Sequence, residues 1–330
     1  MKISCIRRPS AKRLYALIAV IMISVPIMGW SQSSSLAANE EGIILTRMDH
    51  IVVFASSQKK VDELMCIFRE DFQLPVFWGP EGLNVLKGKE LKPAHGYSGG
   101  IFLGNVTLEF ETWEGNDIAE RPPVDCGYIG VAFEPAPLKD AILRLDDKGI
   151  KHSEVEPWFA PMPDGSKALL WKLVYLTQFE GTLLNLFICD YEPRPVKEGD
   201  KMVLRTHADM RKWLKQQLEA DNGGPLSIIR MKELTLGISD MQNRFSEYSN
   251  MLEKQGAGRA TFKFADDQCL RLVQADSDLV ISITLEVSSL EKAANYLKTK
   301  SMLAEVSENR IGISPGSISG LKIYLEEAGK

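Results

Sequence analysis

The sequence has little of what usually identifies an activity directly. Its 330 residues contain no Gly-x-x-x-x-Gly-Lys-Ser/Thr phosphate loop and no His-Glu-x-x-His pair. Cysteine is scarce, with five residues and no Cys-x-x-Cys pair, so we do not expect a disulfide scaffold. Basic residues show no surplus, 39 against 44 acidic ones, which argues against a nucleic-acid partner. What remains is an ordinary globular composition, 45% hydrophobic and 25% charged.

The first 37 residues have the pattern of a secretory signal. Five basic residues precede an uncharged run from 14 to 30, and the small residues Ser35 and Ala37 suit cleavage after Ala37. We therefore predict an exported protein, periplasmic or extracellular, with no stable membrane insertion after cleavage. The alternative is an uncleaved anchor, although this run is at the lower limit for a membrane span and contains Pro26.

Cleavage would also change the charge of the chain. The net charge of the whole sequence is -5. The segment 1–37 carries five basic and no acidic residues, so the mature chain would have 34 basic and 44 acidic residues and a charge of -10. Such a chain is not expected to bind anionic membranes through its net charge.

One local pattern recurs four times along the chain. A β-branched strand at 47–54 is followed by helical spacing of Val61, Leu64 and Phe68, and then by strand signals at 74–78, 100–103 and 106–112. The same order begins again near 127, 230 and 280. We therefore predict an α+β fold made of four βαβββ modules.

The domain boundaries follow from these restarts. Two modules would occupy 44–190, and two more degenerate ones 226–330. Between them, 191–225 is predicted to be a linker with a connecting helix, which opens with a capping-box pattern at Thr206 and Asp209.

The repeated βαβββ order and the strand Asp49-His50-Ile51-Val52-Val53 resemble the vicinal oxygen chelate superfamily. This superfamily includes glyoxalase-like, bleomycin-resistance-like and extradiol-dioxygenase-like proteins. The resemblance implies that the four modules form two pairs, whose curved mixed sheets surround a cavity. It also implies that metal ligands come from the first and last strands of a module. The part that looks most like a glyoxalase-like domain is 44–190.

Carried over to this sequence, the resemblance makes His50 and Glu109 metal ligands and implies a divalent ion of unknown identity as the cofactor. Glu111 would be a third ligand or a general base, and strand alternation places it on the same face as Glu109. The second module departs from this pattern, with Gly130 at the histidine position and Asn185 near the glutamate position. The alternative is therefore that His50 is a cavity-lining histidine bonded to Glu109 or to a backbone carbonyl.

Four other residues are candidates to line the ligand cavity. His95 lies in a glycine-rich run at 92–100 that would let a ligand approach the backbone, or that would simply be a flexible connector. Trp171 and Tyr175, together with Asn185, could line an apolar pocket with a few polar groups. The two aromatic residues could equally be plain core.

Two functions follow from these residues. The first is an exported, metal-dependent lyase, isomerase or dioxygenase that acts on a small oxygenated molecule. The alternative is a metal-independent protein that binds or sequesters a small apolar or aromatic ligand. In both cases the partner is a small molecule. Assembly as a homodimer through 226–330 is a further alternative.

Overall fold

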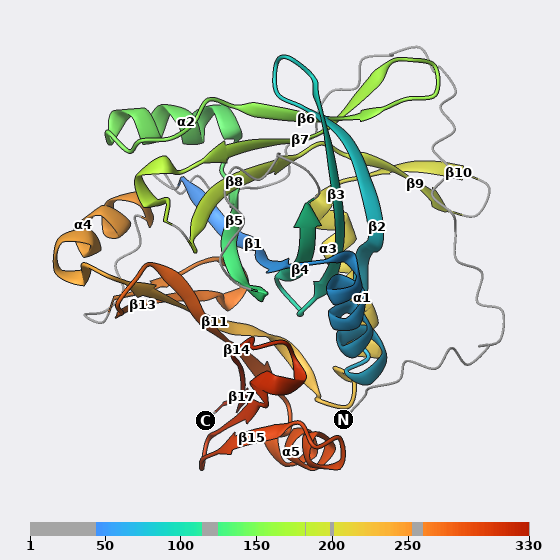
Figure 1. The fold of residues 1–330 in the computed structure, drawn as a ribbon, viewed down its shortest axis with the longest axis vertical. Coiled ribbons are helices and arrows are strands. Elements are labelled where there is room, and N and C mark those ends of the chain that lie inside the picture. Colours follow the sequence, from blue (N-terminus) through green and yellow to red (C-terminus); the bar gives the residue numbers. More distant parts are fainter. Residues whose placement is uncertain (1–43, 114–124, 182, 199–200, 253–259, 330) are drawn as a thin grey trace.

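The fold is α+β, with one closed barrel of eight strands and one open sheet of seven strands (Figure 1). Both sheets are mixed, because each contains parallel and antiparallel pairs. The computed structural model describes residues 44–113, 125–181, 183–198, 201–252 and 260–329. The expected signal at 1–37 lies outside these residues. No helix in the described ranges is long and apolar enough to cross a membrane.

The first half of the barrel comes from residues 45–113. Its elements are β1 (Leu45–Ala55), α1 (Gln58–Cys66), a π-helical turn (Ile67–Asp71), β2 (Val76–Lys87), β3 (Lys92–Phe102) and β4 (Thr107–Trp113). The side chain of Ser57 caps α1 by accepting a hydrogen bond from the Lys60 amide. Val61, Leu64 and Met65 bury one face of this helix. The run at 92–100 is part of β3, so the loop expected there is absent.

The second half of the barrel comes from residues 126–191. Its elements are β5 (Cys126–Pro135), α2 (Leu138–Asp147), β6 (Glu156–Pro161), β7 (Lys167–Tyr175), a 3-10 turn (Thr177–Phe179) and β8 (Asn185–Tyr191). The strand order around the barrel is β1-β4-β3-β2-β6-β7-β8-β5. The two halves therefore join twice, through β1 with β5 and through β2 with β6.

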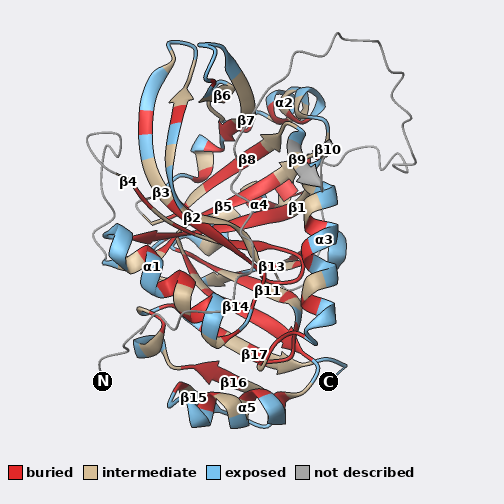
Figure 2. Cartoon of the chain, turned by 90° about the vertical axis from the view of Figure 1, so that its right-hand side faces the viewer, coloured by how far each residue is buried: buried red, intermediate tan, exposed pale blue. Residues whose placement is uncertain are grey.

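The segment expected to be a linker contains more structure than a connecting helix. It begins with a hairpin of β9 (Arg194–Glu198) and β10 (Lys201–Arg205). Helix α3 (His207–Ala220) follows, and the predicted capping box of Thr206 and Asp209 is present. Figure 2 shows α3 along the side of the molecule, beside the barrel and the open sheet.

The open sheet comes from residues 228–327. Its elements are β11 (Ile228–Ile238), α4 (Met241–Leu252), β12 (Thr261–Lys263), a 3-10 turn (Ala265–Asp267), β13 (Cys269–Gln274), β14 (Leu279–Val287), α5 (Leu290–Thr299), β15 (Leu303–Val306), β16 (Arg310–Ile313), a 3-10 turn (Pro315–Ser317) and β17 (Ile323–Glu327). The strand order is β12-β13-β11-β14-β17-β16-β15.

The barrel and the open sheet share one apolar core. This core includes Ile51 and Val131 from the barrel, and Leu234 and Ile283 from the open sheet. A smaller cluster, which includes Val52, Ala132 and Trp158, is separate from it and lies inside the barrel.

Two buried amide side chains connect the sheets reciprocally. The Gln268 amide accepts a hydrogen bond from the Met48 N–H at 2.8 Å and donates to the Met48 carbonyl at 2.7 Å. Asn105 does the same for Met231, at 3.0 Å for both bonds. Each amide therefore satisfies backbone groups at the start of a strand in the other sheet.

Candidate functional site

The inner face of the barrel carries most of the chemically active residues predicted from the sequence. Because side chains alternate along a strand, Leu108 and Phe110 of β4 pack into the shared core, while Glu109 and Glu111 point into the barrel. On β1, His50 lies on the same side as Val52, which belongs to the inner cluster. The structure thus brings the three residues of the predicted metal site together.

A β-bulge in β1 places an additional carboxylate at this site. The pairing with β5 shifts between Met48 and His50, so that Asp49 is an extra residue in β1. A bulge changes the direction of a side chain relative to its neighbours. Here the Asp49 carboxylate lies beside the imidazole of the next residue, His50, whose Nδ1 is 2.8 Å from Asp49 Oδ2.

The buried Asp49 carboxylate connects the barrel to α3. Its second oxygen, Oδ1, is 2.8 Å from His207 Nε2 and 3.2 Å from Arg211 Nη1. Arg211 also contacts Glu134 of β5 at 2.8 Å. The His207 ring stacks on Tyr191 of β8, with ring centroids 3.9 Å apart. One carboxylate therefore orients His50 and fixes the first turns of α3 against the barrel.

The other nitrogen of His50 faces Glu109. His50 Nε2 lies 3.4 Å from Glu109 Oε2. Ser98 of β3 makes a side-chain hydrogen bond to Glu109, and its Oγ accepts one from Trp78 Nε1 at 2.9 Å. Both nitrogens of the imidazole therefore face carboxylates of this chain.

Charges and burial shift the pKa values of this group. Burial alone would raise the pKa of Asp49, but the charges and hydrogen bonds of His207 and His50 hold it well below its usual value. Burial would lower the pKa of His50, but the hydrogen bond to Asp49 and the charge of Glu109 raise it above its ordinary 6.5. His50 is therefore held towards its protonated, doubly donating form.

Glu111 is in the opposite situation. Burial, and then the neighbouring charge of Glu109, raise the pKa of Glu111 to about 8. One oxygen of Glu111 accepts a hydrogen bond from Trp113 Nε1 at 2.8 Å. At neutral pH this carboxyl group retains its proton and can donate a hydrogen bond.

The pairing of β1 with β5 relates the two halves of the barrel. His50 pairs with Ala132, and Val52 pairs with Gly130. A local two-fold axis between β1 and β5 maps each of these pairs onto the other. It therefore maps His50 onto Gly130 and Val52 onto Ala132, which makes Gly130 the counterpart of His50. The sequence indicated the same correspondence.

The counterpart of Glu109 differs from the one expected from the sequence. Glu109 pairs with Val52 in the parallel neighbour of β1, and the equivalent pair in the second half joins Ala132 with Phe187. Phe187 therefore occupies the glutamate position. Asn185, which was expected near it, lies two residues earlier and pairs with Gly130.

Aromatic side chains occupy one part of the barrel interior. The rings of Trp113 and Trp158 are 5.8 Å apart, Trp158 stacks on Trp171 at 5.9 Å, and Trp171 lies 6.5 Å from Tyr191. Trp158 is only 6% exposed, and no described residue accepts a hydrogen bond from its Nε1. A buried donor without a partner is costly, so a ligand acceptor would be favourable there.

The cavity residues predicted from the sequence divide into two groups. Trp171 belongs to the inner aromatic cluster, and the Tyr175 ring lies 5.8 Å from Phe187. His95 does not join them. Ala94, its neighbour in β3, packs into the inner cluster, so alternation places the exposed His95 on the outer face of the barrel.

The residues present do not fit a catalytic metal ion. Such a site typically needs about three protein ligands. Within the described residues, no three His, Cys, Asp or Glu side chains are arranged to hold an ion. His50 and Glu109 contact each other, and Gly130 and Phe187 occupy the two positions from which the second half would supply ligands.

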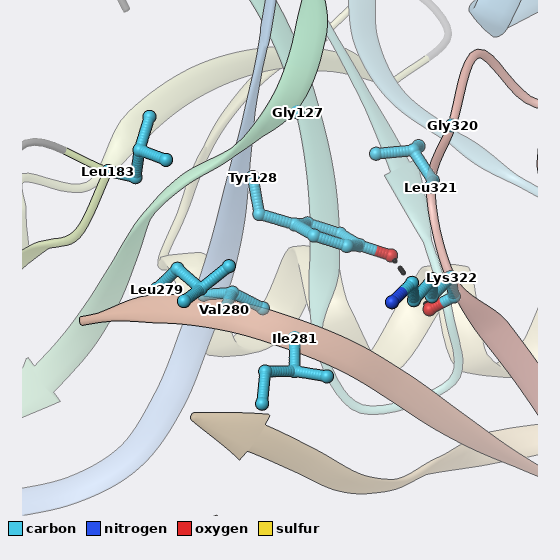
Figure 3. Close-up of a pocket in the computed structure, with 9 residues that line it drawn as sticks. All are labelled: Gly127, Tyr128, Leu183, Leu279, Val280, Ile281, Gly320, Leu321 and Lys322. Atoms are coloured by element: carbon cyan, nitrogen blue, oxygen red, sulfur yellow. Dashed lines mark hydrogen bonds between the residues drawn. The ribbon is translucent and has the colours of Figure 1, made fainter. Parts of the chain in front are cut away.

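Two hollows lie outside the barrel. A crevice of about 200 Å³ lies at the junction of β5, β14 and the segment before β17 (Figure 3). Its lining is mainly aliphatic, and the Tyr128 hydroxyl donates to the Lys322 carbonyl at 3.2 Å. A larger groove of about 630 Å³ lies beside α3.

Several residues of the site were not predicted from the sequence. Asp49 was part of the strand motif, but strand alternation alone turns it away from His50. His207 was assigned only to the capping turn of a helix, 158 positions from Asp49. A polar residue at the start of an amphipathic helix is a weak sequence signal for a site residue. Only the packed structure shows that His207 contacts Asp49.

Comparison with known proteins finds similarity in fold but not in sequence. No protein-family model matches the chain, and no curated protein matches its sequence. A hypothetical protein from Staphylococcus aureus matches in structure with a TM-score of 0.50 and 9% identity, over 85% of this chain and 98% of that chain.

Two further structural matches are dioxygenases. Homoprotocatechuate 2,3-dioxygenase from Arthrobacter globiformis has a TM-score of 0.49 and 9% identity, over 86% of this chain and 80% of its own. The Brevibacterium fuscum enzyme in complex with 3,4-dihydroxyphenylacetate has a TM-score of 0.47 and 9% identity, over the same shares. At such identities a likeness concerns the fold alone, and the chain shares the fold of the Staphylococcus aureus protein over most of its length.

Proposed function

We propose that the barrel binds a small oxygenated molecule with an aromatic or apolar body, and that it does so without a metal ion. The observation that carries this proposal is that Gly130 and Phe187, which offer no metal-binding side chain, occupy the counterparts of His50 and Glu109 in the second half of the barrel. This arrangement leaves an aromatic wall whose ends, Trp113 and Tyr191, adjoin a single cluster of polar groups.

The wall suits an aromatic or apolar body. Trp113, Trp158, Trp171 and Tyr191 form a continuous set of ring contacts on the inner face. Small-molecule sites are mostly apolar and contain a few polar groups that fix orientation. Aromatic pairs favour edge-to-face or offset contacts, which this set would extend to a bound ring.

Two donors suit an oxygen atom of the ligand. Trp158 Nε1 has no partner among the described residues, and Glu111 is protonated at neutral pH because its pKa is raised to about 8. Both side chains adjoin the ring of Trp113. Glu109 retains 14% of its side-chain exposure, so solvent reaches this part of the barrel.

The alternative is the metal-dependent lyase, isomerase or dioxygenase. One observation favours it, because His50 Nε2 and Glu109 Oε2 converge within 3.4 Å and Glu111 is close enough to affect the pKa of His50. Since no three such side chains among the described residues are arranged to hold an ion, this function would require His50, Glu109 and Glu111 to rearrange around it.

A binding experiment separates the two functions. The purified protein is titrated calorimetrically with p-cresol and with cyclohexanol, in the presence and absence of EDTA. We expect p-cresol to bind more tightly, with no effect of EDTA. Trp158→Phe keeps an aromatic ring, although a smaller one, but removes the donor, and should weaken binding at least two- to tenfold, as expected for one hydrogen bond.

Tyr97→Phe is the matched control, because its hydroxyl bonds to Asp62 on the outside of the barrel. It should bind like the wild type. Binding that EDTA abolishes would support the metal-dependent function instead. Equal affinity in the two variants, or no binding of p-cresol, would contradict the proposal.

We also propose that the protein is exported. The support is the signal pattern at 1–37. Expression of the full sequence in a bacterium should give a periplasmic or secreted product whose N-terminal sequence begins at Ala38. A product that retains Met1 in the membrane fraction would indicate the uncleaved anchor.

A further inference from the structure

The groove beside α3 is a second binding site candidate, separate from the barrel interior. One wall is the face of α3 that carries Arg211, Lys212 and Lys215, and the opposite wall is the start of β11 at 228–230. Arg47 of the barrel and the turn at 266–267 close it from the side. Its volume of about 630 Å³ is typical of a small-molecule site.

The groove is positive although the chain is acidic. Its lining contains five cationic and three anionic side chains, a surplus of two positive charges, whereas the whole sequence has a net charge of -5. The charged residues are Arg47, Arg211, Lys212, Lys215, Arg230, Glu219, Asp266 and Asp267.

Some of these cations are available to a ligand. Among the described residues, Lys212 forms no ion pair, and Lys215 reaches only the exposed Glu219, at 3.9 Å. Arg47 and Arg230 are less available: besides the exposed Asp266 and Asp267, Arg47 contacts Glu134 and donates to the Asn105 carbonyl, and Arg230 pairs with the buried Glu286 at 2.7 Å. The cations that a ligand can reach are therefore Lys212 and Lys215, because an exposed pair such as Lys215 with Glu219 contributes little to stability and can be displaced at low cost.

The groove also offers apolar surface. Ile229 is 39% exposed, and it lines the groove together with Ala208 and Ile228. A ligand that matches both features has an acidic group and an apolar part.

We propose that this groove binds an organic anion, either a carboxylate or a phosphate monoester, with an apolar body. Lys212 and Lys215 lie three residues apart and therefore on the same side of α3, so they can contact one acidic group together. Arg211 lines the same groove and also bonds to Asp49, which places the bound anion one side chain away from the Asp49–His50 pair.

The test uses octyl phosphate below its micellar concentration, inorganic phosphate, and octyltrimethylammonium as a cationic probe of equal apolar length. Isothermal titration of the purified protein should show binding of octyl phosphate, weaker binding of inorganic phosphate and none of the cation. The affinity for octyl phosphate should fall as salt is raised, because the lysines are exposed.

The variant Lys212→Gln/Lys215→Gln should bind octyl phosphate about five- to tenfold more weakly, as expected for two exposed charge contacts. Lys139→Gln/Lys298→Gln removes the same charge from the exposed surfaces of α2 and α5, and should bind like the wild type. Equal weakening in both variants, tight binding of the cation, or no binding of octyl phosphate would overturn the proposal. Trp158→Phe should leave this binding unchanged, since the barrel interior is not part of the groove.

Discussion

The ring of Phe187 lies edge-on to the imidazole of His50, with ring centroids 5.5 Å apart. It also fills the space beside Gly130, where an added Cβ would come within 3.3 Å of Phe187 Cε1 and 3.1 Å of the Asn185 carbonyl oxygen. Gly130 and Phe187 therefore belong to one packing arrangement beside His50.

This arrangement predicts that metal binding can be gained by a double substitution. Gly130→His with Phe187→Glu would place a histidine and a glutamate at the counterparts of His50 and Glu109, and would remove the ring that blocks the new side chain. After loading with Mn, Fe, Co, Ni or Zn and dialysis, we expect about one ion per chain in the double variant. Elemental analysis provides the measurement.

The wild type and the single variant Phe187→Glu serve as controls, and neither should retain a stoichiometric ion. Adding His50→Ala to the double variant should remove the ion again. A wild-type protein that retains one ion per chain would show that the residues at positions 130 and 187 do not decide metal binding.

Glu111 makes the stability depend on pH in a defined direction. Its pKa is about 8 in the folded protein against an ordinary 4.5, so the fold is penalised once the unfolded chain can ionise and the folded chain cannot. The stability that the neutral form contributes is complete below pH 4.5 and is lost as pH rises to 8. Glu111→Gln should therefore gain unfolding free energy over the wild type with rising pH, on the order of 5 kcal/mol at pH 9.

Urea denaturation at pH 5, 7 and 9 measures this difference. Glu63→Gln, which removes an exposed carboxylate from α1, is the control and should show no such increase. A difference between Glu111→Gln and the wild type that stays constant from pH 5 to 9 would indicate that Glu111 is ionised throughout.

Gly96 allows Trp113 to lie flat on β3. A Cβ at position 96 would come within 2.8 Å of the Trp113 ring. Gly96→Ala should therefore displace the ring, weaken its hydrogen bond to Glu111 and cost about 1–3 kcal/mol of stability. Gly82→Ala in the neighbouring strand meets no atom within 4 Å and is the matched control.

Thermal unfolding and tryptophan emission together check this prediction. Gly96→Ala should unfold at a lower temperature and show an altered emission spectrum, whereas Gly82→Ala should change neither substantially. Wild-type behaviour of Gly96→Ala would mean that the Trp113 ring moves without strain.

Gln268 should be among the costliest single positions outside the apolar core. It is fully buried and bonds to both backbone groups of Met48 and to the Asn105 carbonyl at 2.8 Å. Gln268→Ala would remove the side chain that bonds both Met48 backbone groups, although the Asn105 carbonyl would keep its bond from Arg47, and should reduce the unfolding free energy by about 2–4 kcal/mol. The exposed Gln274, which also bonds to carbonyl groups, is the control, and Gln274→Ala should cost less than 1 kcal/mol.

Local sequence was enough to predict which side chains of β4 point into the barrel. Alternation along a strand depends only on neighbouring residues, so the positions of Glu109 and Glu111 could be derived from 105–111 alone. Only the end of β3 was predicted, at 100–103, and its first part at 92–99 was missed because its glycines are typical of a loop. They are needed instead because the rings of Trp78 and Trp113 lie against Gly100 and Gly96 inside the barrel.

The rest of the site depends on register and on distant contacts. A register difference of two residues decided whether Asn185 or Phe187 is the counterpart of Glu109 in the second half, and hydrophobic pattern cannot resolve this when both positions face the same side. The bulge at Asp49 has no sequence mark of its own. The contact of Asp49 with α3 joins residues 158 positions apart, which no local pattern can predict.

The reciprocal amides have a consequence for the order in which the molecule can be completed. During synthesis β1 emerges long before residue 268, so the Met48 backbone groups have no native partner until more than two hundred further residues have been made. Contacts this distant in sequence form late, because loop closure must precede them. The barrel therefore cannot reach its final form during synthesis before the part of the open sheet that contains Gln268 has been made. An N-terminal half released on its own would leave the Met48 backbone groups unpaired.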